Sequence, residues 1–334
     1  MKTFKAITLN KNIKDLGDFA TYIRDNSITM TASDFDATGK QGWFIGGEAQ
    51  MSLKKKIESK GVPLKDWDVK IYRGVLTGLN EAFIIDKSTK EKLILEDPKS
   101  AEIIKPILRG RDIKRYGYEF AELYILIVKF GAYKNLKEDY PAIYNHLINF
   151  EVQLRERGQC RYSRSSNEKN GSEYSGQHHW IELDNNPTQE YINLFYENKI
   201  IWPMVSTKQC IFSYLEKGVF VNNKGYIIVG ENTKYILAVL NSSLAWYLFR
   251  SGEASLGASS LEIRKEGVEN YSIPKITEQN KSGVEKIEKL VDQILEMKKV
   301  SVSADTKDLE REIDVIVYGL YELTEEEIKI IEEK

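Results

Sequence analysis

The sequence feature that most limits how this chain can fold is a glycine-containing turn between two short apolar segments. Residues 73–80 read RGVLTGLN, so two glycines and an asparagine stand where a strand must reverse its direction. Glycine adopts a positive φ angle without steric cost, and asparagine tolerates that conformation better than most residues do. We therefore predict a strand at 69–72, a sharp turn at 77–80 and a second strand at 82–85.

A compact basic cluster follows this turn further along the chain. Four cations occur within seven positions and an aromatic residue comes directly after them: Arg109, Arg111, Lys114 and Arg115, then Tyr116. Lysine and arginine side chains neutralise the phosphates of nucleic acids and fix a protein's register on them. The glycine turn and this cluster together are what a protein that contacts a phosphate backbone needs.

The charge of the chain is distributed unevenly, although its 334 residues carry a net charge of only −2. Residues 105–170 hold 13 Lys and Arg against 8 Asp and Glu, a net of +5, while residues 301–334 hold 4 against 11, a net of −7. This pattern indicates a face for an anionic partner and a tail that faces solvent or a basic partner. Chance clustering on a solvated surface is the alternative interpretation.

The sequence motifs of several enzyme classes are missing. Neither a phosphate-binding GxxxxGK[ST] loop nor a Gly-x-Ser-x-Gly elbow occurs in the sequence. Residues 184–187 read DNNP, which lacks the second proline and the aromatic residue of a DNA amino-methyltransferase loop, so we interpret them as an ordinary turn. The clustered carboxylates and lysine of a magnesium-dependent nuclease are not evident either. We therefore predict no catalytic residues in this chain.

Metal, disulfide and membrane signals are equally weak. Cys160 and Cys210 lie fifty residues apart without CxxC spacing, and the adjacent His178 and His179 have poor geometry for sharing a metal ion. The longest apolar stretch, 235–249, is shorter than the about 20 residues that a bilayer-spanning helix needs. The N-terminus lacks the apolar core of a secretory signal. We predict no metal, no membrane contact and a cytoplasmic location.

Apolar periodicity and turn residues predict a mixed α+β fold. We expect helices and strands at the following positions: helices at 50–59, 97–105, 139–157, 189–198, 235–249, 284–295 and 307–320, and strands at 122–130, 199–203, 209–214, 219–221 and 226–229. The Asn-Ser-Ser sequence at 241–243 is expected to interrupt one of these helices. Thr324 and Glu327 form a capping box for a last short helix, and Trp180 and Trp202 are expected in the core.

Residues 158–178 differ in composition from the rest of the chain, because they are rich in Ser, Gly, Asn and Arg and nearly free of aliphatic residues. A loop of this length inside a compact domain is usually functional or disordered. We expect a mobile basic loop that becomes ordered on DNA, and a disordered insertion is the alternative. The candidate contact residues in and before this loop are Arg155, Arg157, Arg161 and Arg164.

Several segments resemble one protein family, and they occur in the same order as in that family. The strongest are RGVLTGLNEAFIID at 73–86 and IIKPILRGRDI at 103–113, followed by IIWP at 200–203, LAVLNSS at 237–243 and YSIP at 271–274. Together they resemble the C-terminal target-recognition domain of TaqI-like adenine-specific DNA methyltransferases and type IIG restriction-modification enzymes.

This resemblance implies sequence-specific recognition of double-stranded DNA, with catalysis by domains outside the chain. Cationic side chains would then fix the register on phosphates, and polar side chains would read base edges in the major groove. The resemblance implies no cofactor in this chain, and S-adenosylmethionine and magnesium only for the missing catalytic domains. The implied DNA-binding residues are Arg73, Thr77, Gly78, Asn80, Arg109, Arg111, Lys114, Arg115, Arg155, Arg157, Arg161 and Arg164.

The resemblance covers residues 43–334 and lacks the upstream methyltransferase and nuclease domains. We therefore expect either a separately encoded specificity subunit or the C-terminal part of a longer enzyme. The predicted organisation is an N-terminal linker with a helix at 1–67, a β-rich target-recognition domain at 68–275 and C-terminal helices at 276–334. Two alternatives remain open. One is a type I-like specificity subunit that recruits separate methyltransferase chains, and the other is a stand-alone DNA-modifying enzyme with an unrecognised active site.

Overall fold

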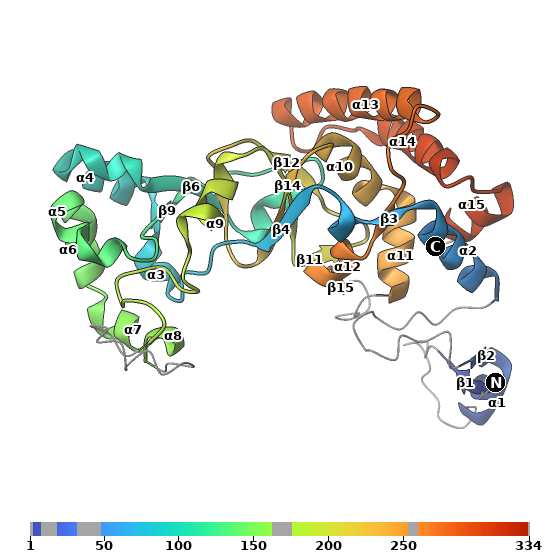
Figure 1. Ribbon diagram of the computed structural model, residues 1–334, viewed down its shortest axis with the longest axis horizontal. Coiled ribbons are helices and arrows are strands. Elements are labelled where there is room, and N and C mark those ends of the chain that lie inside the picture. Colours follow the sequence, from blue (N-terminus) through green and yellow to red (C-terminus); the bar gives the residue numbers. More distant parts are fainter. Residues whose placement is uncertain (1–2, 8–18, 32–47, 162–175, 253–259, 333–334) are drawn as a thin grey trace. The chain divides into compact units, whose positions relative to one another are not determined.

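Helices and several small sheets alternate along the chain, which confirms the predicted mixed α+β fold (Figure 1). The computed structural model describes residues 3–7, 19–31, 48–161, 176–252 and 260–332. Among these residues no helix is both long enough and apolar enough to cross a membrane.

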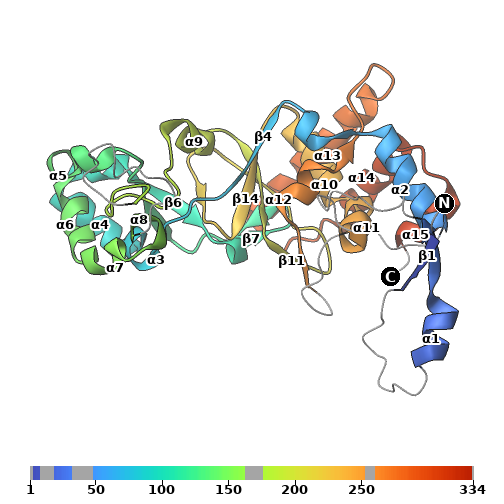
Figure 2. The same cartoon turned by 60° about the horizontal axis from the view of Figure 1, so that its bottom comes forward.

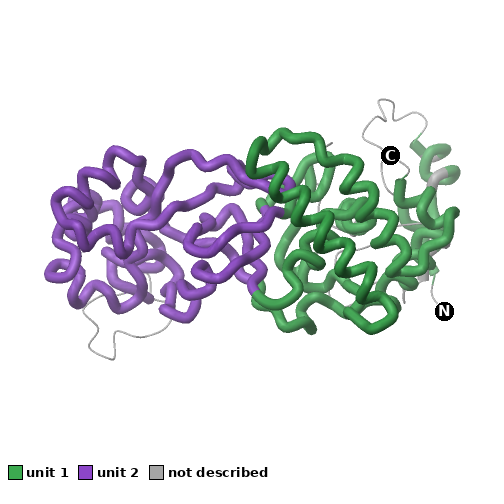
Figure 3. The backbone as a smooth tube through the Cα atoms, turned by 90° about the horizontal axis from the view of Figure 1, so that it is seen from above, with its two compact units in different colours: residues 1–71, 203–212, 230–334 green, residues 72–202, 213–229 purple. Residues whose placement is uncertain are grey.

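The chain forms two compact units and passes between them four times (Figure 3). Unit 1 comprises residues 1–71, 203–212 and 230–334, and unit 2 comprises residues 72–202 and 213–229. Each unit therefore contains segments that lie far apart in the sequence. The domain bounds predicted from the sequence, 1–67, 68–275 and 276–334, stay a prediction.

Unit 2 is built on two small sheets whose strands come from distant parts of the chain. One sheet has the order β12-β10-β14-β4 and the other the order β13-β6-β9-β5, with a separate β7–β8 hairpin. Strand β13 runs parallel to β6, and β9 is antiparallel to both β5 and β6. The passages between the units fall inside β4, β10 and β14 and after Phe212. The strand bounds are β4 Val69–Arg73, β5 Ile84–Asp86, β6 Ile104–Leu108, β7 Ile113–Lys114, β8 Gly117–Tyr118, β9 Leu123–Leu126, β10 Lys199–Pro203, β12 Ser213–Leu215, β13 Phe220–Val221 and β14 Gly225–Gly230.

Short helices surround these sheets. Figures 1 and 2 show α4, α5 and α6 grouped together, and α6 packs against both of the others. The α-helices are α3 Asn80–Phe83, α4 Lys87–Glu96, α5 Leu136–Asp139, α6 Pro141–Ile148, α7 Glu151–Arg155, α8 Gly158–Arg161 and α9 Gln189–Asn193. The 3₁₀-helices are η4 Pro98–Glu102, η5 Gly110–Asp112, η6 Ala132–Lys134 and η8 Leu194–Tyr196.

Aromatic side chains fill much of the core of unit 2. Trp202 is fully buried and stacks on Tyr226 with ring centroids 4.9 Å apart, and Phe195 stacks on Phe220 at 4.5 Å. Trp180 is also buried. The sequence placed both tryptophans in the core, and this prediction is confirmed. Burying such large side chains supplies most of the hydrophobic stabilisation of a small domain.

Unit 1 is mainly helical. Helix α13 buries a stripe that includes Val284, Ile287, Val291 and Ile294, as the 3.6-residue period predicted. It packs against α10 and α14. The helices of unit 1 are α1 Phe19–Asn26, α2 Glu48–Lys60, η3 Leu64–Asp66, α10 Thr233–Asn241, α11 Ser243–Gly252, α12 Lys265–Glu269, α13 Lys281–Val300, α14 Lys307–Leu320 and α15 Glu325–Glu332. Its strands form three antiparallel pairs: β1 Thr3–Ala6 with β2 Ile28–Thr31, β3 Val62–Pro63 with β16 Ser272–Ile273, and β11 Val205–Thr207 with β15 Ser260–Glu262.

Two local predictions in unit 1 are confirmed. Thr324 and Glu327 form the expected capping box, because each backbone N–H donates to the other side chain, at 2.8 and 3.3 Å. The helix expected at 235–249 is divided into α10 and α11. Ser242 is extended at the break, and the Asn241 side chain there hydrogen-bonds both the N–H and the carbonyl oxygen of Phe212.

Other predictions were wrong in detail. The helix expected at 97–105 is only the 3₁₀-helix η4, and strand β6 already begins at Ile104. The second strand was expected at 82–85, but α3 occupies residues 80–83 and β5 begins only at Ile84. One helical turn there buries both Ala82 and Phe83, which alternation along a strand would place on opposite faces. The helix expected at 139–157 is divided into α6 and α7 at Asn149. The Asn149 amide donates back to two carbonyl oxygens of α6, which competes with continuation of the helix.

Candidate nucleic-acid interface

The turn at 77–80 has the backbone conformation that its glycine predicted. Gly78 has a φ angle of +70°, in the left-handed region that glycine reaches without steric cost. The Thr77 hydroxyl donates a 2.7 Å hydrogen bond to Oδ1 of Asn80 and so closes the turn. Thr77 is buried, whereas Gly78 and Asn80 are exposed. The outer part of the turn is therefore the part that a ligand can reach.

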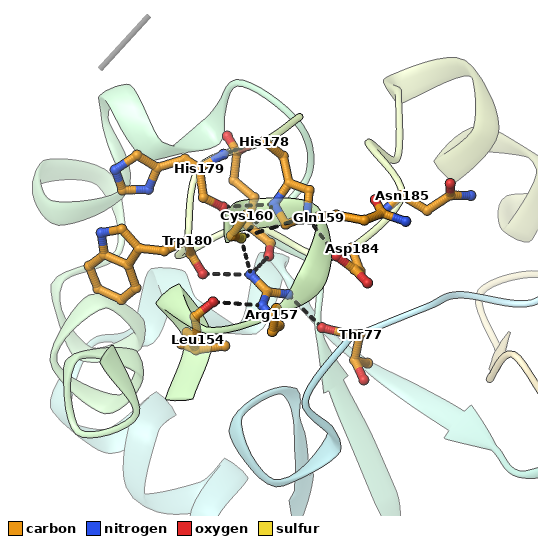
Figure 4. Close-up of polar contacts among 11 residues, drawn as sticks. Thr77, Leu154, Arg157, Gln159, Cys160, His178, His179, Trp180, Asp184 and Asn185 are labelled. Atoms are coloured by element: carbon orange, nitrogen blue, oxygen red, sulfur yellow. Dashed lines mark hydrogen bonds and ion pairs between the residues drawn. The ribbon is translucent and has the colours of Figure 1, made fainter. Parts of the chain in front are cut away.

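Arg157 is buried at the base of this turn (Figure 4). Its Nη1 donates to the carbonyl oxygen of Thr77 at 2.6 Å, and its Nη2 donates to those of Trp180 and Glu182 at 2.6 and 2.7 Å. Its Nε donates to the carbonyl oxygen of Leu154. Since the side chain is only 6% exposed, this arrangement favours a structural role for Arg157 over the DNA contact suggested by the sequence.

A buried ion pair lies beside Arg157. His178 Nε2 is 2.6 Å from Oδ1 of Asp184, and His178 Nδ1 is 2.8 Å from the carbonyl oxygen of His179. The Cys160 sulfur is 3.6 Å from His178 Nδ1. Burial alone would lower the pKa of His178, but its hydrogen bonds with Asp184, Cys160 and the His179 carbonyl outweigh burial and raise the pKa to about 9. His178 is therefore protonated at neutral pH and holds Asp184 in place.

The neighbouring His179 has the opposite electrostatic character. Burial, together with the positive charges of Arg155 and His178, lowers the pKa of His179 to about 4, so its ring is neutral at neutral pH. The ring stacks on Tyr133 with centroids 4.5 Å apart. Burial also raises the pKa of the nearby Glu182, whose carboxylate accepts from the backbone N–H groups of Tyr133 and His179. These contacts are all internal, which again indicates a structural assembly.

The residues on either side of segment 162–175 lie next to each other. The backbone N–H of Gln177 donates a 2.8 Å hydrogen bond to the carbonyl oxygen of Gln159. The segment itself lies outside the described residues, and so do Arg164 and the side chain of Arg161. The expectation of a basic loop therefore remains a prediction for that segment, but its two attachment points are held together by the buried cluster around Arg157.

Arg73 lies at the end of β4, and its side chain is exposed. Its Nε donates a 2.7 Å hydrogen bond to the carbonyl oxygen of Asn223, which belongs to the turn between β13 and β14. The next residues bind the same region, since the N–H of Val75 donates to the carbonyl oxygen of Val221. The structure therefore joins Arg73 to a turn that is 150 residues away in the sequence.

The Arg109 side chain pairs with Asp112, three residues further along the chain. It donates from Nε and Nη2 to the two carboxylate oxygens of Asp112, at 2.9 and 2.8 Å, and its backbone N–H donates to the same carboxylate. Burial would raise the pKa of Asp112, but the hydrogen bonds from Arg109 outweigh this and lower it. A two-point pair of this kind fixes the turn of η5. Arg109 is therefore better placed to stabilise this turn than to contact a ligand.

The other members of the basic cluster are closer to solvent. Arg111 is exposed, and its carbonyl oxygen accepts a 3.0 Å hydrogen bond from the Lys114 ammonium. Lys114 also forms a 3.3 Å ion pair with Glu119. The Arg115 guanidinium lies over the ring of Tyr116, 5.2 Å from its centroid. The cluster thus presents its charge mainly through half-buried side chains and the exposed Arg111.

Arg155 is the exposed counterpart of Arg157. It forms a 2.7 Å ion pair with Glu151 one helical turn earlier, and its guanidinium lies over the ring of Trp180 at 5.0 Å. More than half of its side chain is exposed, at 56%. Among the arginines predicted around the loop, Arg155 is the one whose described side chain reaches solvent.

The structure adds one cation that sequence reasoning missed. Lys224 is exposed in the turn between β13 and β14, and a Cβ atom built on Gly110 would lie 3.2 Å from the Lys224 Cβ. The sequence of residues 222–225, NNKG, is typical of a turn. Sequence alone could have found this turn, but it offered no reason to connect it with the basic cluster.

Chemically, the described parts of the chain offer turns, backbone groups and cations. No group of three or more His, Cys, Asp or Glu side chains among the described residues could hold a metal ion. The residues 184–187 form a turn in which Asn185 and Asn186 both have positive φ angles, as the sequence indicated. A surface of this kind is suited to binding an anionic polymer.

Comparisons with known proteins identify the type of domain. The sequence model of the TaqI-like C-terminal specificity domain matches residues 105–274, just over half of the chain. The type IIL restriction-modification enzyme MmeI, solved in complex with DNA, shares the fold with a TM-score of 0.59 and 14% identity. The match covers 80% of this chain and 35% of MmeI.

A second solved structure, the type IIG restriction endonuclease BpuSI, has a TM-score of 0.45 and 15% identity to this chain. That alignment covers 82% of this chain and 33% of BpuSI. The chain therefore spans only about a third of the length of either enzyme. A search of curated proteins gives no match.

Proposed function

This chain belongs to the family of TaqI-like C-terminal specificity domains, and on that premise we propose that it recognises a specific sequence in double-stranded DNA for a restriction-modification enzyme. The match of residues 105–274 to that family carries the proposal. The matched range contains the basic cluster at 109–115 and the whole segment 158–178. The positive charge of these segments suits contacts with phosphates, which position a protein on a duplex.

The exposed arginines supply the first contacts in this proposal. Arg73 and Arg111 reach solvent from two segments of unit 2, while Arg109 and Arg157 stabilise the turns beside them. Arg155 adds charge at an exposed position, and Lys114 and Arg115 add charge at half-buried positions. Direct reading of base edges falls to polar side chains near the turn at 77–80 and to the segment 162–175.

The catalytic steps belong to other parts of the system in this proposal. A methyltransferase or nuclease domain or subunit, of the type IIG kind, would act on an adenine flipped out of the duplex. S-adenosylmethionine and magnesium would be bound there, and the specificity domain would determine which adenine is presented. A cytoplasmic location follows from this role.

Binding of the purified chain to a fluorescently labelled random-sequence duplex, measured by anisotropy at several salt concentrations, tests the proposal. The logarithm of the association constant should fall linearly with the logarithm of the salt concentration, with a slope of about −0.9 for each phosphate contact. Arg111→Ala should weaken binding and make the slope shallower. Arg311→Ala is a matched control, because Arg311 is an exposed arginine on α14 that already pairs with Asp308. Failure of the wild-type chain to bind any duplex at low salt would contradict the proposal.

A further inference from the structure

The turn between β13 and β14 is closed by its own hydrogen bonds. The N–H of Gly225 donates to the carbonyl oxygen of Asn222 at 2.9 Å, which closes a four-residue turn. The Asn222 side chain accepts a 3.1 Å hydrogen bond from the N–H of Lys224. Asn222 is buried, while Lys224 points into solvent from a fixed backbone.

Two other segments fix this turn from outside. The N–H of Asn222 donates to the carbonyl oxygen of Leu108, and the N–H of Gly74 donates to that of Gly225, both at 2.9 Å. Gly110 presses against the turn so closely that an added Cβ atom would lie 2.6 Å from the carbonyl oxygen of Lys224. A side chain at position 110 would therefore displace the turn.

These contacts bring together three segments of the backbone that each carry an exposed cation. The Arg73 Nε is 2.7 Å from the carbonyl oxygen of Asn223, directly before Lys224. Arg111 directly follows Gly110, which packs on Lys224. Arg73, Arg111 and Lys224 come from three separate segments of the sequence, and all three are exposed. Exposed cations on adjoining segments supply the positive charge to which a polyanion binds.

We propose that the turn 222–225 is a further DNA-contacting element and that Lys224 binds a phosphate of the duplex together with Arg73 and Arg111. This inference rests on the proposed function and adds a residue to it. Gly74 and Gly110 allow the two other segments to approach the turn closely, because a side chain at either position would collide with the backbone of the turn.

Substitution of Lys224 in the full chain tests the inference, with duplex binding measured against salt concentration. Lys224→Ala should weaken binding of a random-sequence duplex and reduce the salt-dependence slope by about 1, the value for one lost phosphate contact. Lys224→Arg should restore the slope. Lys92→Ala is the matched control, because Lys92 is an exposed lysine of unit 2 on helix α4. Its substitution removes the same charge as Lys224→Ala.

The outcomes separate this inference from the proposed function. If the wild-type chain binds DNA but Lys224→Ala and Lys92→Ala change the slope equally or not at all, the turn is not a contact and the inference is overturned, while the proposed function stands. If the wild-type chain binds no duplex, the proposed function itself fails. Far-UV circular dichroism and the thermal midpoint of Lys224→Ala should match the wild type, because the replaced side chain is exposed.

Discussion

The guanidinium of Arg157 donates a 2.6 Å hydrogen bond to the carbonyl oxygen of Thr77, a residue 80 positions earlier in the chain. The same guanidinium binds the carbonyl oxygens of Trp180 and Glu182, which follow the segment 162–175. One buried side chain therefore links the glycine turn to the stem of that segment. If both are parts of a DNA-reading surface, the hydrogen bonds of Arg157 set their relative position.

Replacement of Arg157 should destabilise the chain strongly. Arg157→Ala leaves several buried carbonyl oxygens without a hydrogen-bond donor, and we expect a loss on the order of 3 kcal/mol in the free energy of unfolding. Arg155→Ala is the matched control two residues away. It breaks an exposed ion pair with Glu151 and a cation–π contact with Trp180, each worth at most about 1 kcal/mol. Urea unfolding followed by tryptophan fluorescence measures both. Equal midpoints for the two variants would contradict the structural role of Arg157.

A side chain at position 78 should destabilise the chain for two separate reasons. Gly78→Ala forces a residue with a Cβ atom into φ +70° and places that atom 2.6 Å from the Arg157 Cδ. Gly131 has a φ of +83° but open space around it, so Gly131→Ala measures the backbone cost alone, about 1 kcal/mol. Gly78→Ala should therefore lower the unfolding midpoint further than Gly131→Ala. A smaller effect at Gly78 would show that the packing against Arg157 is not tight.

Local signals in the sequence predicted many elements correctly, because they depend on neighbouring residues. The left-handed Gly78, the capping box of Thr324 and Glu327, and the break at Ser242 are of this kind. The role of Arg157 was not predictable, since an arginine at the end of a predicted helix, next to a polar, Ser-rich stretch, gives no sign that it will be buried. Lys224 was missed for a related reason, because its position beside Gly110 depends on parallel pairing between β13 and β6.

The stability of the chain should depend on pH through His178. The folded pKa of about 9 lies above the ordinary value of 6.5, so the stabilisation is fully present below pH 6.5 and is lost as pH rises through 9. This ring contacts Asp184, Cys160 and the carbonyl oxygen of His179, and it interacts electrostatically with Glu182. Arg157 contacts the same Cys160 sulfur. Full deprotonation should cost about 3 kcal/mol at most.

His178→Gln provides the test of this pH dependence. The variant should be less stable than the wild type at pH 6.5, and the difference should shrink as the pH rises towards 9, because the wild type then loses its ion pair. Thermal midpoints of both proteins across this pH range give the measurement. A constant difference between the two proteins at every pH would rule out a protonated His178.

The contact between Gly110 and the turn at Lys224 should be sensitive to a single methyl group. Gly110→Ala places a Cβ atom 2.6 Å from a backbone oxygen, so we expect a loss of about 1–3 kcal/mol in stability and weaker duplex binding. Gly319→Ala is the control, because nothing lies within 4 Å of the added atom and alanine favours the helix α14. Unfolding midpoints and anisotropy titrations measure the two effects. If Gly110→Ala matched the wild type in both stability and duplex binding, the turn at Lys224 would be able to shift without cost.

Selection from a duplex library with a randomised central region tests the central claim most directly. The purified chain is incubated with the library at moderate salt, and the bound fraction is recovered and sequenced over several rounds. A specificity domain should enrich one defined sequence motif, since each mismatched base pair typically costs about 1–3 kcal/mol. Recovery of DNA with no enriched motif would show that the chain binds the backbone alone, and this would contradict its assignment as the part that reads the DNA sequence.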